Sequence, residues 1–350
     1  MPGTSTPLLP SPDFTWDPVA NPPVAGIRPF RKTTYRLEPE NAGGKFVVHN
    51  YGHGGAGITM SWGCAREVVD IVTQHGFAQA QPIAVCGSGV MGLTAATLLT
   101  GLGLKVTVYA EKFPPNTTSN VAGGQWAPSL VNHVDTAQFN RILRRAFAMH
   151  SARIGQGFGV SHRVNYSPHH SPNFETIPKD VIPAPQAFKH LPFAHFNQPG
   201  FGYSTLLVEP PIFLAKLVAD LGVAGAVFTP TTFANAAQVL ALPEAIIVDC
   251  TGLGGGKIWN DALVVPVRGQ LVKLPPQPAL QYLYSGHGYL FPRQDAVVVG
   301  GSEEPGVTDD TPDLAMCKVI LANVKNVFAG VTHPMVARDM ALADWFIQNK

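Results

Sequence analysis

The spacing of hydrophobic residues along the chain predicts a protein of mixed helices and strands. In five segments apolar residues recur every three or four positions, which is typical of helices with one buried face. These predicted helices cover residues 58–76, 90–103, 136–155, 211–222 and 314–328. In the first of them Ile58, Trp62, Val69 and Val72 share a face, and Gly76 suits the C-terminal end.

Three short runs rich in apolar residues predict buried parallel strands. They are "PIAVCG" (82–87), "KVTVYAE" (105–111) and "AIIVDC" (245–250). The first two flank a predicted helix and so form a βαβ unit of the usual length. Further strands are predicted over 31–39, 45–51, 269–275, 289–294 and 296–304.

Two segments have little periodicity. Residues 1–25 are rich in proline and predict an extended arm, because proline is excluded from helix interiors and central strands. Residues 155–203 are rich in proline, histidine and phenylalanine and predict an irregular region.

Composition narrows the class of protein. Hydrophobic residues make up 45% of the 350 residues and charged residues 13%, against about 25% charged in typical globular proteins. This composition indicates extensive burial and argues against a disordered chain. The net charge of +1 gives no electrostatic ground for binding nucleic acid or an anionic membrane.

The four cysteines are scattered without a CxxC pair, which predicts no disulfide framework. Cys86 and Cys250 end apolar runs, where cysteine usually packs as a small hydrophobic residue. The sequence has neither the layout of a signal peptide nor a run of 18 apolar residues. We therefore expect a soluble, cytoplasmic protein.

A glycine motif, Gly87-x-Gly89-x-x-Gly92, lies between the first buried strand and its helix. In such motifs the first glycine permits a tight turn, the second lets the backbone approach a pyrophosphate, and the third lets helix and strand pack closely. Glu111, at the end of the next strand, is placed to accept hydrogen bonds from a ribose. Together these features predict a dinucleotide site, the alternative being only a tight strand-to-helix turn.

Two other stretches suit the same site. Thr117, Thr118 and Ser119 form a hydroxyl-rich corner near the expected phosphates, although such a corner alone is often an ordinary turn. Thr251 and Gly252 follow a buried strand and suit a close approach to a sugar or phosphate.

These motifs together resemble the D-amino-acid oxidase family of FAD enzymes, which includes D-aspartate oxidase and is related to glycine oxidase. The resemblance covers most of residues 26–325 and is carried by six stretches. They are "VCGSGVMGLTAATLL", "VYAEKFPPNTTSNVAGGQWAP", "VDCTGLGGG", "VRGQLVKL", "IRPFRKTTYRLE" and "HNYGHGGAGITMSWGCA". In that family the last two stretches lie near the C-terminal end, whereas here they come first, so the chain resembles a circular permutation of the family fold.

The resemblance implies an α/β (α+β) fold in which a Rossmann-like FAD-binding domain is interdigitated with a β-sheet substrate-binding domain. The FAD-binding domain would comprise residues 36–126 and 205–256, and the substrate-binding domain 26–35, 127–204 and 257–330. Residues 1–25 would form the proline-rich arm, and 331–350 a C-terminal tail. New chain ends at the surface make such a permutation plausible.

The resemblance also implies two groups of FAD contacts. The adenine dinucleotide side would meet Gly87, Ser88, Gly89, Val90, Met91, Gly92, Glu111, Lys112, Thr117, Thr118, Ser119, Thr251 and Gly252. Gly124, Gln125 and Trp126 would also contact FAD, with the Gln125 N–H facing flavin N5. The flavin ring would meet Gly54, Gly55, Ala56, Gly57, Ile58 and Thr59. Helix-end N–H groups and the Thr59 hydroxyl would stabilise the negative charge of the reduced ring.

The family reaction oxidises an α-amino acid by hydride transfer from Cα to flavin N5, with oxygen as the acceptor that yields hydrogen peroxide. The imino acid hydrolyses to a keto acid and ammonia. Arg28 matches the arginine that binds the substrate carboxylate, Tyr289 matches one of two pocket tyrosines, and the Gly55 carbonyl would accept the amine. The second tyrosine position falls at Ser285, one residue from Tyr284, and this departure leaves the substrate open.

A small-molecule amino acid, most readily a D-amino acid, is thus the expected substrate. Alternatives on the same fold are an oxidase of glycine or N-substituted amino acids, an N-oxygenase, a dehydrogenase with another acceptor, or a flavin-binding protein without turnover. No metal is expected, and His49 and His53 are interpreted as structural hydrogen-bonding residues. His162, Arg163, His169, His170 and His195 form either a pocket for an acidic side chain or, as we prefer, a solvated loop. The oligomeric state is open, with a homodimer as one alternative.

Overall fold

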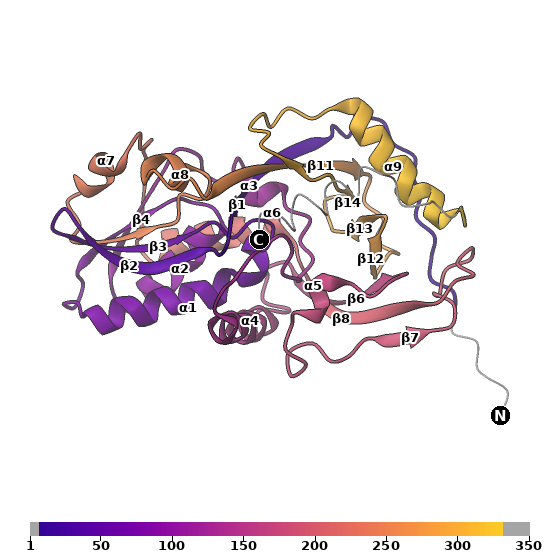
Figure 1. The fold of residues 1–350 in the computed structure, drawn as a ribbon, viewed down its shortest axis with the longest axis horizontal. Coiled ribbons are helices and arrows are strands. Elements are labelled where there is room, and N and C mark those ends of the chain that lie inside the picture. Colours follow the sequence, from indigo (N-terminus) through magenta and orange to yellow (C-terminus); the bar gives the residue numbers. More distant parts are fainter. Residues whose placement is uncertain (1–6, 332–350) are drawn as a thin grey trace.

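The computed structural model describes residues 7–331, whose strands form two sheets set side by side (Figure 1). The smaller sheet, at the left of Figure 1, has six strands. In spatial order they are β2 (Arg36–Ala42), β3 (Lys45–Tyr51), β10 (Ile246–Asp249), β4 (Pro82–Cys86), β5 (Lys105–Ala110) and β9 (Val227–Pro230). All neighbours pair in parallel except β2 with β3.

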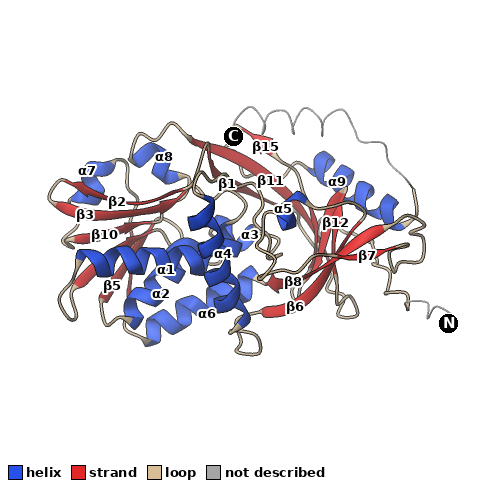
Figure 2. Ribbon diagram, turned by 60° about the horizontal axis from the view of Figure 1, so that its bottom comes forward, coloured by secondary structure: helices blue, strands red, loops and turns tan. Residues whose placement is uncertain are grey.

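Helices cover both faces of the smaller sheet, which explains why its central strands are wholly buried (Figure 2). One face carries α1 (Gly57–His75), α2 (Val90–Gly101), α4 (Thr136–Ser151) and α6 (Pro210–Val223). The other carries α7 (Ala236–Leu240) and α8 (Gly254–Ile258). Along β4, Ile83 and Val85 belong to the first core, while Ala84 and Cys86 belong to the second.

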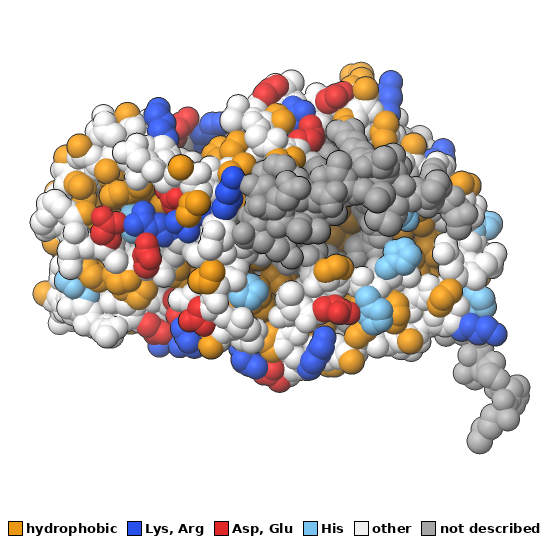
Figure 3. Space-filling view, in the orientation of Figure 1, with side chains coloured by type: hydrophobic (Ala, Val, Ile, Leu, Met, Phe, Trp, Pro, Cys, Tyr) orange, Lys and Arg blue, Asp and Glu red, His pale blue; other side chains and the backbone are white. Residues whose placement is uncertain are grey.

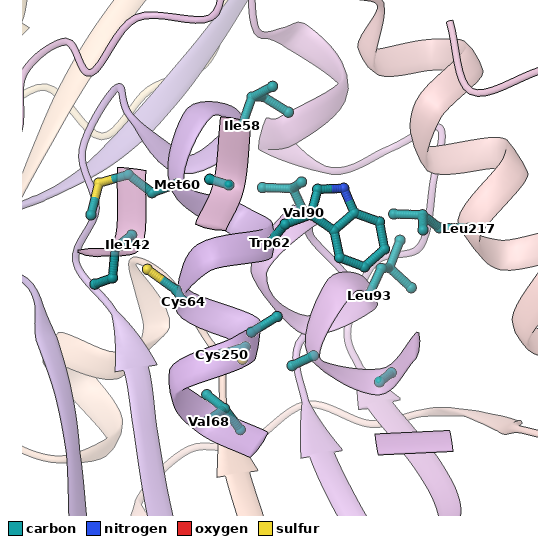
Figure 4. Packing of buried hydrophobic residues seen from close by; sticks show 14 of the residues in the cluster. Ile58, Met60, Trp62, Cys64, Val68, Val90, Leu93, Ile142, Leu217 and Cys250 are labelled. Atoms are coloured by element: carbon teal, nitrogen blue, oxygen red, sulfur yellow. The ribbon is translucent and has the colours of Figure 1, made fainter. Parts of the chain in front are cut away.

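Helix α1 is the centre of the larger core. Figure 4 shows Trp62 of α1 beside Val90, Leu93 and Leu217 of the neighbouring helices. On the opposite side α4 packs so closely that a Cβ atom on Gly63 would lie 2.1 Å from the Ile142 carbonyl oxygen. The glycine at position 63 therefore sets the distance between α1 and α4.

The larger sheet has nine strands and supplies the second half of the molecule. Its main path is β1 (Val24–Arg31), β11 (Val264–Leu274), β14 (Val297–Gly300), β13 (Gly288–Pro292), β12 (Leu283–Gly286), β6 (Val160–Ser167), β8 (Gly200–Val208) and β7 (Gln186–Phe188), with β15 (Glu304–Pro305) paired to β11. Helix α9 (Leu314–Phe328) packs on this sheet over a separate apolar cluster. Two short helices, α3 (Thr118–Val121) and α5 (Pro172–Glu175), lie in the connections.

The described part of the N-terminal segment is packed against this second half. The Tyr282 hydroxyl donates to the Pro10 carbonyl at 2.7 Å. The rings of Phe14 and Phe328 lie 5.7 Å apart, so the segment before β1 contacts the end of α9. The two ends of the described chain are therefore neighbours in space.

The helix predictions agree with the structure, whereas three predictions on strands and loops are wrong. The predicted strand 296–304 is interrupted, because β14 ends at Gly300 and β15 begins only at Glu304. The predicted strand 31–39 is interrupted, because β1 ends at Arg31, β2 begins at Arg36, and Thr33 between them has a φ of 68°. Residues 155–203, predicted as irregular, contain β6, β7 and the start of β8. The sequence pattern of β6 and β8 was hard to recognise because polar residues occupy some of their buried positions. These residues are Asn165 and Ser167 in β6 and Thr205 in β8.

The face of the molecule drawn in Figure 3 shows no dominant charge. On the face in Figure 3, basic and acidic side chains are interspersed among apolar and neutral ones. Within residues 7–331 no helix combines the length and the apolar character that crossing a bilayer requires.

Candidate active site

A cavity of about 1460 Å³ is lined by residues of both sheets. Ligand pockets are typically about 300–1000 Å³, so this one has room for a large cofactor and a small substrate together. The glycine loop between β4 and α2, the first glycine box and Arg28 of β1 all line it. The cavity therefore joins the two glycine-rich stretches that were predicted to bind opposite ends of one cofactor to the arginine predicted to bind the substrate.

The glycine loop 87–92 is shaped by contacts that exclude side chains. Gly87 has a φ of 111°, and a Cβ atom there would lie 2.3 Å from the Cys250 carbonyl oxygen. A Cβ atom on Gly92 would lie 1.9 Å from the Gly87 carbonyl oxygen. Helix α2 then begins with Gly89 as an N-cap that supplies no side-chain hydrogen bond. Backbone N–H groups at such a helix end favour an anionic ligand such as a diphosphate.

The hydroxyl-rich corner lies next to this helix end, as the sequence predicted. The Ser119 hydroxyl accepts a hydrogen bond from the Val90 N–H at 3.0 Å, which joins α3 to α2. Thr117 and Thr118 border the same cavity. The Ser88 hydroxyl donates to the Lys112 carbonyl, so the glycine loop is also tied to the end of β5, where Glu111 lines the cavity.

A buried histidine supports the strand end at Thr251. Asp249 accepts from the Thr251 hydroxyl at 2.7 Å with one oxygen, and its other oxygen lies 3.0 Å from Nδ1 of His49. Nε2 of His49 lies 3.0 Å from Glu40. His49 thus bridges two carboxylates across neighbouring strands, which is the structural role expected for it.

The first glycine box passes directly beside β1. The Gly54 N–H donates to the Pro29 carbonyl at 2.9 Å, next to Arg28. A Cβ atom on Gly54 would lie 1.9 Å from the Leu130 carbonyl oxygen, so only glycine fits there. Helix α1 then starts at Gly57 without a side-chain cap. Gly54, Gly55, Gly57 and Ile58 all line the cavity.

His53 in this box is a neutral, buried side chain. Burial lowers the pKa of His53 to about 3. Its Nε2 lies 3.4 Å from the Cys64 sulfur, and its ring stacks on Tyr35. Within residues 7–331 no group of three or more His, Cys, Asp or Glu side chains is arranged to hold a metal ion.

Four residues predicted to touch the cofactor lie behind the cavity wall rather than on it. They are Ala56, Thr59, Gly92 and Trp126. The Thr59 hydroxyl donates to the Ala127 carbonyl at 2.9 Å and accepts from the Ala127 N–H at 3.1 Å. Its proton is therefore used inside the protein, and in this arrangement it cannot donate to a flavin as we expected.

Gln125 lies in an isolated antiparallel bridge with Leu207. The backbone groups on either side of this bridge form hydrogen bonds. The Trp126 N–H donates to the Leu206 carbonyl, and the Val208 N–H donates to the Gly124 carbonyl, both at 2.8 Å. Among the described backbone groups, none accepts a hydrogen bond from the Gln125 N–H. This N–H remains available to a ligand in the cavity that Gln125 lines.

The Arg28 guanidinium lies flat across the neighbouring strand. A Cβ atom on Gly269 of β11 would lie 2.3–2.4 Å from the guanidinium atoms, so the missing side chain makes room for it. Nη1 of Arg28 donates to the Ser302 carbonyl at 3.0 Å. Since β1 and β11 pair along their whole length, the sheet fixes Arg28 at the cavity.

Tyr289 and Ser285 complete this end of the cavity. They lie opposite each other in the β12–β13 pair, and both line the cavity. Burial raises the pKa of Tyr289, and the positive charge of Arg28 opposes this rise. Ser285 accepts a hydrogen bond from Asn165 at 2.7 Å. Tyr284 instead packs against Phe328 in the second core and cannot replace the missing tyrosine.

Several cavity residues were not found from the sequence. Glu303 was seen only as part of a strand, and Ser167 and Asn173 lay in a segment predicted as irregular. The same segment holds Asn165, which does not line the cavity but donates a hydrogen bond to Ser285. Of the histidine-rich set, His169 and His170 line the cavity, whereas His162 and His195 are exposed and do not. The histidines therefore do not assemble into one pocket for an acidic side chain.

Comparisons with known proteins agree with this geometry. Residues 82–345 match the family of FAD dependent oxidoreductases called DAO. The chain is 28% identical over 252 residues to D-aspartate oxidase from Homo sapiens, covering 69% of this chain and 74% of the relative. It is 26% identical over 264 residues to D-amino acid oxidase from Dugesia ryukyuensis, covering 71% and 78%.

Solved structures show the same fold. The structure is similar to glycine oxidase from Bacillus cereus ATCC 14579, with a TM-score of 0.53, 16% identity and coverage of 69% of this chain and 78% of that one. It is also similar to iminodiacetate oxidase from Chelativorans sp. BNC1, with a TM-score of 0.52, 16% identity and coverage of 71% and 78%.

Proposed function

Since the chain belongs to the DAO family of FAD-dependent oxidoreductases, we propose that it is an oxidase of free α-amino acids and that its substrate is a D-amino acid. Its products would be the imino acid, which hydrolyses to a keto acid and ammonia, and hydrogen peroxide. The observation that carries the proposal is the single cavity that joins the glycine loop to Arg28. The D-aspartate and D-amino acid oxidases among its relatives support the same reaction.

The described residues fit an FAD molecule. The uncapped start of α2 and the hydroxyl corner of α3 would hold the diphosphate, with Glu111 at the ribose. The glycine box before α1 and the Gln125 N–H would face the flavin ring. When bound, the flavin would supply the two-electron acceptor for hydride from the substrate Cα.

Arg28 would bind the substrate carboxylate. A guanidinium presents two parallel N–H groups to a carboxylate and so fixes both its position and its plane. The Gly269 backbone beneath and the Ser302 carbonyl beside it hold the guanidinium in one orientation. Positioning of this kind supplies a large part of the rate when the chemical step needs no strong acid or base.

The amine would be held by the Gly55 carbonyl, which lies in the loop bonded to β1 beside Arg28. The carbonyl oxygen would accept a hydrogen bond from an N–H group of the amine. The lone pair of the amine nitrogen would then point in another direction. The flanking positive φ at Gly54 brings this backbone into the cavity. Carboxylate and amine are thus held by groups on two bonded segments.

Oxygen as the electron acceptor and a cytoplasmic location are parts of the same proposal. The location is supported by the four cysteines, which are all buried free thiols, as is typical of reducing compartments. Peroxide formation and cell fractionation test these two points separately.

We also propose that the chain is a circular permutation of its family. The family match begins at residue 82, whereas β3 and α1 precede it in the chain. Nevertheless β3 pairs with β10, and α1 packs against α2, inside the same core. This arrangement supports the proposal that 26–75 corresponds to the C-terminal part of the relatives.

The test of the function is anaerobic titration of the FAD-loaded protein with D- and L-enantiomers of the same amino acids. Reduction of the flavin absorbance band by D-enantiomers, followed by peroxide formation when oxygen is admitted, is the expected result. A flavin that stays oxidised with every amino acid would overturn the proposal.

A further inference from the structure

Glu303 is a carboxylate in the cavity that the proposed chemistry does not use. It follows β14, is half-buried and lines the same cavity as Arg28 and Tyr289. Within residues 7–331 neither a hydrogen bond nor an ion pair holds its carboxylate. Carboxylates that are partly withdrawn from water are normally paired, so this one lacks its partner.

The sheet explains why Glu303 faces the cavity and its neighbour does not. Glu304 pairs with Arg268 of β11, accepting from its guanidinium at 2.5 Å and from Gln270 at 2.8 Å. Successive side chains of a strand point to opposite faces. Glu303 directly precedes β15, and unlike Glu304 it lines the cavity, as do Gly269 and Arg28.

Arg28 does not neutralise Glu303 in this arrangement. Burial raises the pKa of Glu303, and the charge of Arg28 only partly opposes that rise. Nη1 of Arg28 is bonded to the Ser302 carbonyl, and its guanidinium is the group that would bind the substrate carboxylate. A cation bound in the cavity would compensate the Glu303 carboxylate, because both line the same space.

The cavity has space for a long substrate side chain at this end. Ser285 occupies the position where the resemblance predicts a tyrosine, and it lies opposite Tyr289 in the β12–β13 pair. The Tyr289 ring lies against Gly300 and Gly301, directly before the Glu303 segment. The Tyr289 ring fills the space over these two glycines, so the room beside Arg28 comes from the small side chain of Ser285, which also lines the cavity.

We propose that Glu303 selects substrates whose side chain ends in a cation, that is, an amino or guanidino group. This inference rests on the oxidase function proposed above and names the class of substrate that the same site would bind. The α-carboxylate binds Arg28, and the distal cation binds Glu303, so each charge of a basic amino acid meets an opposite charge. An acidic side chain would instead meet the Glu303 carboxylate and be repelled.

The experiment compares D-lysine, D-norleucine and D-glutamate as substrates of the FAD-loaded enzyme. D-norleucine matches the length of D-lysine without its charge. We expect kcat/KM for D-lysine to exceed that for D-norleucine by at least about tenfold, as a charge-assisted hydrogen bond allows. A wild-type enzyme that prefers D-glutamate over D-lysine would overturn the inference without any variant.

Two variants locate the effect. Glu303→Gln should lower kcat/KM for D-lysine by about 10- to 100-fold while that for D-norleucine stays within about twofold. Glu303→Arg should move the preference toward D-glutamate. Asp310→Asn is the matched control, since Asp310 is an exposed carboxylate that also borders the cavity, and it should leave the D-lysine to D-norleucine ratio unchanged.

Failure of this inference differs from failure of the oxidase function. If D-norleucine reduces the flavin and Glu303→Gln leaves the D-lysine ratio unchanged, the inference is wrong and the oxidase stands. If no amino acid reduces the flavin, the proposed function is wrong, and the inference falls with it.

Discussion

At the scale of single residues, glycines determine where the charged groups lie, because they leave space that a side chain would fill. Arg28 can cross β11 because position 269 is a glycine, and the Gly55 carbonyl reaches the cavity because Gly54 fits against the Leu130 carbonyl. Any larger residue at 269 or 54 would meet atoms closer than van der Waals contact allows. The site therefore depends on glycines outside the nucleotide motif as much as on Arg28 itself.

Replacing Arg28 with alanine should lower kcat/KM for any amino-acid substrate by at least about 30-fold. The reason is that removing one partner of a buried charge pair costs about 2–5 kcal/mol. FAD content should stay near that of the parent, because Arg28 belongs to the larger sheet, whereas the glycine loop follows a strand of the smaller one. Stopped-flow flavin reduction measures the effect.

Arg28→Lys is the control for that measurement. It keeps the charge but loses the planar pair of donors, so an intermediate rate is expected. If the alanine variant is reduced as readily as the parent, the carboxylate has been assigned to the wrong residue.

Replacing Gly269 with alanine should displace Arg28 without unfolding the protein. The new Cβ would lie 2.3 Å from the guanidinium, which is the flexible end of a long side chain and can move. We expect kcat/KM to fall by at least about tenfold, by the same loss of oriented hydrogen bonds. The melting temperature and FAD content, measured in parallel, should change little; a normal kcat/KM would show that Arg28 needs no support from this strand.

At the scale of elements, two helices begin at the cavity, and each begins in a glycine-rich turn without a side-chain cap. These are α1 after the first glycine box and α2 after the second. Both helices pack against each other in one core, so their N-terminal ends are held in fixed relation. The Val90 N–H at the start of α2 is bonded to the Ser119 hydroxyl. The other N–H groups in the first turns of the two helices suit the two negatively charged parts of a reduced flavin dinucleotide.

Replacing Gly63 with alanine tests how closely helix α1 packs against helix α4. A Cβ there would lie 2.1 Å from the Ile142 carbonyl oxygen of α4, and backbone cannot move aside cheaply. We expect the free energy of unfolding to fall by about 1–3 kcal/mol, as for overpacked cores. Urea denaturation followed by circular dichroism provides the measurement.

Gly222→Ala is the matched control, because Gly222 lies in helix α6 with nothing within 4 Å of the added Cβ. There alanine should raise the free energy of unfolding, by up to about 1 kcal/mol. Equal effects at the two positions would mean that α1 and α4 are not in the close contact described.

At the scale of the whole molecule, β1 and β11 connect the two halves. β1 pairs with β11 along its whole length (Figure 1). The two strands carry Arg28 and Gly269, which both line the cavity. Residues from both ends of the described chain meet near α9, where Phe14 contacts Phe328. The order of segments along the chain is thus largely independent of their arrangement in space.

This independence predicts that the segment order can be changed. A chain that opens between Gln79 and Ala80, in an exposed linker, and joins Lys350 to Met1 through a Gly/Ser linker of about 10–20 residues should fold and bind FAD. It would carry the segment order expected for the family. Flavin absorbance and melting temperature of the purified chain check this.

The control is a chain of the same kind that opens inside α1, between Met60 and Ser61. This opening cuts a buried helix and should abolish FAD binding. A chain opened at the exposed linker that also fails to bind FAD would contradict the proposed permutation.

Much of the fold was predictable because its patterns are local. The helix over 314–328 and the βαβ unit around Gly87 follow from apolar spacing within a few residues. Strands β6 and β8 were missed because their buried positions hold Asn165, Ser167 and Thr205, whose burial depends on partners from distant segments. For the same reason the sequence did not show which of two neighbouring glutamates lies in the cavity. Glu304 pairs with Arg268 of β11, whereas Glu303 lines the cavity.

By itself, the sequence determined the helices, the buried strands, the two glycine boxes and the family to which the chain belongs, since each is written in short stretches whose residue types constrain the local backbone. Only the tertiary structure decided that Thr59 bonds to Ala127, that Tyr284 points into the core, and that Arg28 and Glu303 share one cavity. These outcomes depend on strand register and on contacts between residues that are far apart in the sequence. Such contacts form through packing, and spacing along the chain carries no record of them.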